Sequence, residues 1–220
     1  FVHGFWSYQR IASLVNFIFY KAVLIAFTQF LFGMYSRFSG TELFNNVLLL
    51  TYNVLLTAFP ILATAVLDKS LPRQTAENNV IAYKEQQSQT FNLFVFSLWV
   101  FRALLHSVML FYIPYFCFYS ENPFPTYRNT EGVFSHGTID TWFFSTTVFY
   151  GTALLPTLNV FFVTKSINVI NLSACLFSIF VIFWVPWLLN TEGFSSIAPE
   201  LTGVIDLMYK SPVWWLTMFI

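Results

Sequence analysis

Residues 169–189 have the sequence VINLSACLFSIFVIFWVPWLL, which contains no charged side chain. A helix needs about 20 mostly apolar residues to cross the hydrocarbon core of a bilayer, so this stretch is long enough to span a membrane. The rest of the chain has the same character. Of its 220 residues, 57% are hydrophobic and only 9% are charged, whereas soluble globular domains have about 25% charged residues. The composition therefore excludes an ordinary soluble domain and favours an all-α, multi-pass membrane protein.

Five further apolar runs extend this pattern along the chain. Together with residues 169–189, the predicted spans cover residues 11–35, 43–67, 91–118, 139–163 and 213–220, the last of which is cut off at Ile220. We therefore predict one domain, residues 1–220, built as a polytopic transmembrane helix bundle with six visible spans. The chain begins without Met and ends inside an apolar run, so we expect it to be part of a longer polypeptide.

Lysine and arginine residues are divided unevenly between the two ends of these spans. Basic residues are retained preferentially in cytoplasmic loops. The side of the membrane on which the chain begins has Arg10, Lys69, Arg73, Lys84 and Lys165. The opposite side has Arg37, Arg128 and Lys210. We therefore expect the N-terminus and the loop near residues 68–89 to lie in the cytoplasm.

Charge and cysteine content narrow the possible ligands. The formal net charge is zero and no basic stripe forms, which argues against a nucleic-acid partner. Cys117 and Cys175 match no spacing of a metal or redox site. All ten carboxylates fall in predicted loops or at span ends, although hard cations are coordinated by oxygen ligands that include carboxylates. We expect no metal site here, which disfavours a pump for bare metal cations.

Two cations lie inside the predicted spans, where a charged side chain is costly and often functional. Lys21 lies about ten residues into the first span, roughly 15 Å along the helix, which is close to the midplane. At that depth the ammonium group is too far from the interface to reach it easily by snorkelling, so we interpret Lys21 as a buried functional or structural cation. Arg102 lies at similar depth in the third span, where burial and snorkelling both remain open. We expect His106, one turn later, to be a packed, hydrogen-bonded residue.

A polar stripe marks the second span. Asn53, Thr57, Pro60 and Thr64 have the spacing i, i+4, i+7 and i+11, which places them on one face of an α-helix. Pro60 has no amide hydrogen, so the carbonyl of Leu56 is free to meet a side chain, water or ligand. The stripe is suited to line a cavity, but small polar residues of this kind routinely join neighbouring helices in membranes, and we favour that packing interpretation.

Short motifs follow one another along the chain. HGFWSYQRI at residues 3–11 is followed by FYK at 19–21, then by YNV at 52–54 with Thr57, Pro60 and Asp68, by HS at 106–107 and by SPVWWL at 211–216. In this order they resemble the fifth, sixth, seventh and tenth membrane helices of the phospholipid-flippase P-type ATPases. The resemblance covers the whole chain.

This resemblance implies the C-terminal half of a ten-helix membrane domain. Such enzymes use a phosphoenzyme cycle to move phospholipid headgroups from the outer to the cytoplasmic leaflet of eukaryotic plasma, secretory or endosomal membranes. ATP and Mg²⁺ would be bound by cytoplasmic domains that precede this chain, which would have no catalytic residue of its own. Implied partners are membrane phospholipid, the N-terminal half of the polypeptide and, where present, a two-span accessory subunit. The resemblance implies coupling and cavity roles for Lys21 and Asn53. Together with Thr57, Pro60 and Arg102, which the polar stripe and the charge inside the third span single out, they are the expected substrate-path or coupling residues.

Three positions depart from the usual residues of that family. Ala22 follows the lysine where Asn is common, Ala65 stands where Gly is usual, and Arg102 replaces an uncharged residue. These departures keep an alternative open, in which a non-transporting, flippase-like module anchors or regulates a partner or a fused signalling enzyme such as a guanylate cyclase.

Overall fold

The computed structural model describes residues 2–68, 91–119, 127–128, 134–135, 141–164, 168–191, 193 and 197–219. The described helices are α1 (Val2–Tyr35), α2 (Asn46–Thr51), the π-turn η1 (Tyr52–Leu56), α3 (Ala58–Leu67), α6 (Leu93–Tyr119), α7 (Thr141–Val163), α8 (Val169–Leu189), the 3-10 turn η3 (Pro199–Leu201), α9 (Val204–Lys210) and α10 (Pro212–Phe219). Two short strands, β1 (Tyr127–Arg128) and β2 (Phe134–Ser135), pair antiparallel. The all-α helix bundle is confirmed, with this small β pair as an addition outside the helices.

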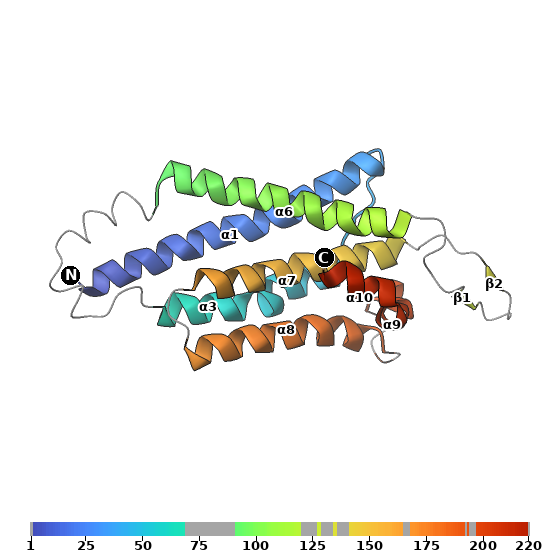
Figure 1. Ribbon diagram of the computed structural model, residues 1–220. Coiled ribbons are helices and arrows are strands. Elements are labelled where there is room, and N and C mark those ends of the chain that lie inside the picture. The colour runs from blue at the N-terminus through green and yellow to red at the C-terminus, as the bar shows by residue number, and fades with distance from the viewer. Residues whose placement is uncertain are drawn as a thin grey trace.

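The long helices run lengthwise beside one another (Figure 1). α1 and α6 form a pair on one side, and α3, α7 and α8 form the other side, with α9 and α10 at the end of the bundle where α1 finishes. Within the part of the chain that the structure describes, five helical segments are long and apolar enough to cross a membrane: His3–Tyr35, Asn46–Leu67, Leu93–Phe118, Trp142–Val163 and Val169–Leu189. They correspond to the first five predicted spans, and α10 lies in the sixth.

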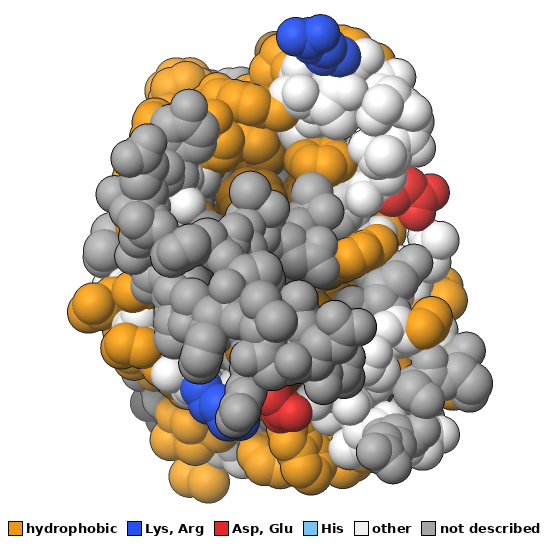
Figure 2. All heavy atoms as spheres, turned by 90° about the vertical axis from the view of Figure 1, so that its right-hand side faces the viewer, with side chains coloured by type: hydrophobic (Ala, Val, Ile, Leu, Met, Phe, Trp, Pro, Cys, Tyr) orange, Lys and Arg blue, Asp and Glu red, His pale blue; other side chains and the backbone are white. Residues whose placement is uncertain are grey.

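Charged side chains do not gather at the end of the bundle that carries α9. On the face seen in Figure 2, the described basic and acidic side chains are isolated among hydrophobic and uncharged polar ones.

α1 begins at Val2, well before the predicted start at residue 11. Its 34 residues give a length of about 51 Å, which exceeds the ~30 Å hydrocarbon core. Phe5 and Trp6 are buried, so packing continues the helix through a segment that is too polar to be counted as a span. Near this end, Arg10 Nε donates a hydrogen bond to the backbone carbonyl of Asp68 at 2.6 Å and so connects α1 to the end of α3.

The second span is divided by η1. Its first helix begins at Asn46 rather than at residue 43, because the side chain of Asn45 caps the helix by accepting from the amide of Val47 at 2.9 Å. η1 then occupies Tyr52–Leu56, and Thr57 Oγ1 donates to the carbonyl of Tyr52 at 2.9 Å. This side-chain bond supports the change from π-helical to α-helical geometry.

α7 lies at the centre of the bundle and α6 at its edge. In the most apolar 18-residue window of each helix, 61% of the residues of α7 are buried but only 11% of those of α6. α6 packs mainly on α1, where Ser107 Oγ donates to the carbonyl of Leu24 at 3.1 Å. One face of α6 is therefore left for lipid or for another protein segment.

An aromatic cluster holds α9 and α10 against α7 and α8. The hydroxyls of Tyr150 and Tyr209 are 2.8 Å apart, and Tyr209 also donates to the carbonyl of Phe183 at 2.9 Å. Burial raises the pKa of Tyr209, so its hydroxyl stays protonated and remains a donor at neutral pH. Trp214 is fully buried between Tyr150 and Tyr209.

Candidate functional site

Lys21 contacts the second span where η1 meets α3. Its Nζ donates to Thr57 Oγ1 at 3.2 Å and lies 5.7 Å from the ring centroid of Tyr52. Tyr52 and Thr57 are each 1% exposed, whereas Lys21 is half-buried. The ammonium group is therefore held by a neutral hydroxyl and an aromatic face at the two ends of one π-turn.

The described hydrogen-bond partner of Lys21 lies in the same chain, because its Nζ donates to Thr57. A hydroxyl accepts a hydrogen bond but does not neutralise the charge. Lys21 therefore keeps the capacity to attract an anionic group.

The polar stripe of the second span keeps three of its four members together. Thr57, Pro60 and Thr64 are buried, and the opposite face with Leu55 and Leu62 is exposed.

The prediction is wrong for Asn53, which is exposed. A π-turn bonds i to i+5 and holds more residues per turn than an α-helix, so Asn53 does not align with Thr57. Its shared spacing with Thr57 and Thr64 would place it on their face only in a regular α-helix.

Most of the stripe serves helix packing. Thr64 Oγ1 lies 3.2 Å from Thr164 Oγ1 at the end of α7. The Leu56 carbonyl that Pro60 leaves free accepts a hydrogen bond from Ser178 of α8. Both observations favour the packing interpretation at these positions. Among the buried members of the stripe, Thr57 is the one bonded to a charged group.

Arg102 lies apart from the Lys21–Thr57 pair. Tyr20, the residue before Lys21, directs its hydroxyl to His106 Nδ1 of α6 at 2.6 Å. Successive helical residues are about 100° apart, so Tyr20 meets α6 while Lys21 meets the second span. Arg102 is exposed on α6, so the structure does not bring the two predicted cations into one site. His106 is a packed, hydrogen-bonded residue, as expected.

Two features of this region were not found from the sequence. Tyr52 was noted as part of a motif, but its contact with Lys21 depends on the π-turn. Asn159 of α7 is 3% exposed, and neither polar atom of its side chain has a partner among the described residues. An asparagine inside the apolar run 153–163 was the available signal.

The comparisons with known proteins agree with one another. A family model described as the C-terminal region of phospholipid-translocating P-type ATPases matches residues 1–220. Phospholipid-transporting ATPase DRS2 of Saccharomyces cerevisiae is 27% identical over 224 aligned residues, which cover 100% of this chain and 16% of that protein. Phospholipid-transporting ATPase 2 of Arabidopsis thaliana is 40% identical over 113 residues, 51% of this chain and 10% of that protein. Human phospholipid-transporting ATPase ID is 31% identical over 115 residues, which cover 52% of this chain and 10% of that protein. The chain thus spans only a small part of each of these relatives.

Proposed function

This chain belongs to the C-terminal region of the phospholipid-translocating P-type ATPases, and from this we propose that it is the membrane part of an ATP-driven phospholipid flippase. In this proposal, phospholipid headgroups move from the outer to the cytoplasmic leaflet. The match over all 220 residues is the observation that carries the proposal. Five helices of membrane-spanning length and composition support it.

The Lys21–Thr57 pair is the proposed coupling point. It joins α1 to the second span at a π-turn, and π-turns inside helices are frequent at functional sites. Because the charge of Lys21 is not neutralised by Thr57, it can respond to a phosphate or carboxylate that approaches the second span. Asn53, which is exposed within this turn, is a proposed contact of the lipid headgroup.

ATP and Mg²⁺ are assigned to parts of the polypeptide outside this chain. Within the flippase they supply the phosphoryl transfer that drives the cycle. The residues of this chain are proposed to bind and position lipid, and to pair with the N-terminal half of the same polypeptide. A two-span accessory subunit is a further proposed partner.

The proposal is tested by lipid transport in vesicles that contain the complete polypeptide. Fluorescent phosphatidylserine, phosphatidylethanolamine and phosphatidylcholine are compared, and dithionite bleaching measures how much of each remains in the accessible leaflet. We expect ATP and Mg²⁺ to change that fraction for at least one headgroup, whereas vesicles with ATP but without Mg²⁺ show no change. Normal ATP hydrolysis without movement of any of the three lipids would contradict the proposal and favour the anchoring or regulatory alternative.

The chain is an integral, multi-pass membrane protein, and its orientation is a separate prediction. We propose a cytoplasmic N-terminus in a eukaryotic plasma, secretory or endosomal membrane, because basic residues are enriched at that end. In a background in which Cys117, Cys175 and the other native cysteines of the polypeptide are replaced by serine, single cysteines are introduced at two positions. One is Ser88→Cys, at a position outside the described residues, and the other is Ser135→Cys in β2. An impermeant maleimide added to intact cells or sealed right-side-out vesicles is expected to label the second variant at once and the first only after permeabilisation. Labelling of both from the same side would refute the topology.

A further inference from the structure

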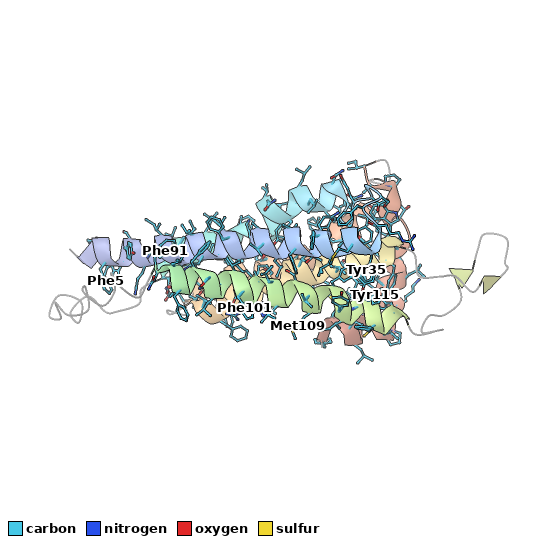
Figure 3. The ribbon with its side chains drawn as sticks, turned by 90° about the horizontal axis from the view of Figure 1, so that it is seen from above. Phe5, Tyr35, Phe91, Phe101, Met109 and Tyr115 are labelled. Carbon is cyan, nitrogen blue, oxygen red and sulfur yellow. The ribbon has the colours of Figure 1, made fainter. Side chains whose placement is uncertain are left out.

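Arg102 is an exposed cation on α6, the least buried of the described spans. Leu98, Phe101 and Leu105 are 49%, 58% and 49% exposed on α6. Figure 3 shows Phe101 and Met109 on the edge of α6 that is turned away from α1. A guanidinium among such neighbours keeps its charge and needs an anionic partner.

The depth of Arg102 lets its side chain extend toward the headgroups of one leaflet. The apolar span of α6, Leu93–Phe118, has 26 residues and is about 39 Å long, so about 4–5 Å extends beyond each side of a ~30 Å core. Arg102 comes nine residues after Leu93, roughly 14 Å along the helix and so about 9 Å inside that core. Helical side chains lean toward the N-terminus, and an arginine reaches roughly 6 Å, which brings its guanidinium to about 3 Å below the edge of that core, next to the headgroup region that a lipid phosphate occupies.

The protein itself supplies no anion to Arg102 within the described residues. No described side chain or carbonyl forms a hydrogen bond or ion pair with it. Glu42 and Asp206 belong to the opposite end of the bundle, near the end of α1 and in α9. Asp68 follows α3, which belongs to the second span. The second span is contacted by Lys21 of α1, whereas α6, which carries Arg102, is contacted by Tyr20 on a different side of α1.

The segment that carries Arg102 is firmly held. One turn before it, the Trp99 ring packs edge-on against Tyr20 with 5.9 Å between centroids. One turn after it, His106 is bonded to the same tyrosine at 2.6 Å. Contacts on both sides fix the helix rotation, so the direction of the Cα–Cβ bond of Arg102 is set in advance.

We propose that Arg102 binds the phosphate of an anionic glycerophospholipid in the leaflet at the N-terminal end of α6. The guanidinium donates paired hydrogen bonds to phosphate oxygens, and the acyl chains lie along Leu98, Phe101 and Leu105. This lipid is a fixed ligand at the edge of the bundle and differs from the transported one, because Arg102 is separated from the Lys21–Thr57 pair by α1. The inference goes beyond the proposed transport function and does not depend on it.

Photo-crosslinking of lipid in nanodiscs tests this site in the complete polypeptide. The discs contain phosphatidylcholine with 10 mol% of a probe, either phosphatidylglycerol or phosphatidylcholine with a diazirine in one acyl chain, and mass spectrometry quantifies adducts on residues 93–109. We expect Arg102→Gln to lower the phosphatidylglycerol adducts about fivefold, the effect of one basic residue at an anionic surface, and to leave phosphatidylcholine adducts unchanged. Arg102→Lys should retain most of the signal. The matched control is Arg37→Gln, an exposed arginine at the opposite end of α1, which should change neither.

Several outcomes would overturn the proposal. One is equal phosphatidylglycerol adducts in the wild type and in Arg102→Gln. Another is loss of those adducts when 10 mM inorganic phosphate is added, which would assign the site to free phosphate. Reduced thermal stability of Arg102→Gln without any change in adducts would assign the arginine to a carboxylate elsewhere in the polypeptide. If Arg102→Gln does not assemble, the wild-type protein alone is used for the test. Equal adduct yields from the phosphatidylglycerol and phosphatidylcholine probes would then exclude selection of an anionic lipid. None of these readouts requires transport, so failure here and failure of the flippase proposal are distinguishable.

Discussion

Lys21→Met is expected to reduce lipid-stimulated ATP turnover of the complete polypeptide by about 5- to 150-fold, the range in which one coupling interaction usually falls. Methionine keeps the length of the side chain but removes the ammonium group that donates to Thr57 and lies over Tyr52. Assembly should be preserved, because removing a charge from the bilayer also removes its desolvation cost. Turnover at saturating lipid and monodispersity by size-exclusion chromatography are measured on the same preparation.

The control is Lys210→Met, which removes the same charge from an exposed position in α9. It should leave turnover and its dependence on headgroup unchanged. A second variant, Thr57→Val, removes the acceptor while retaining the lysine, and we expect it to lower turnover in the same direction. Wild-type, headgroup-dependent turnover in Lys21→Met would remove Lys21 from the mechanism.

Trp214→Ala is expected to be the most destabilising single substitution considered for this chain. Trp214 is fully buried, and its ring centroid lies 5.3 Å from that of Tyr150 and 5.5 Å from that of Tyr209. Truncating a buried tryptophan costs about 3 kcal/mol or more, because the cavity refills only partly. For a chain of this size that corresponds to a lower melting temperature by about 6–12 °C, measured as loss of the monodisperse peak after heating.

Trp184→Ala is the control, because it makes the same Trp-to-Ala change at a position that is not fully buried. Trp184 is 45% exposed on α8 and packs on one side against Phe180, so its truncation leaves a much smaller void. We expect a shift of less than about 3 °C. Equal shifts for the two variants would show that the cluster around Trp214 does not hold α9 and α10 in place.

The sequence predicted the spans well because run length and hydropathy are properties of single segments. It predicted the start of α1 poorly, since Phe5 and Trp6 extend the helix by packing and not by average hydropathy. It also placed Asn53 on the wrong face, because residue spacing does not reveal a π-turn.

Relations between helices were the least predictable part of the candidate site. Tyr20 and Lys21 are adjacent in sequence, yet they contact α6 and the second span respectively. Only the arrangement of α1 between these two elements shows that Arg102 and Lys21 belong to different surfaces. The partner of the Leu56 carbonyl, Ser178, is likewise 122 residues away in sequence.

The uninterrupted length of α1 gives it the mechanics of a lever. Its contact with Asp68 at Arg10 can serve as a fulcrum, and Lys21 lies 11 residues further on, about 16 Å away. A tilt of about 10° around that fulcrum moves Lys21 by roughly 3 Å, which is more than the hydrogen bond to Thr57 can tolerate. The angle of one stiff rod would then determine whether the ammonium group stays on the π-turn or is released to meet another anion.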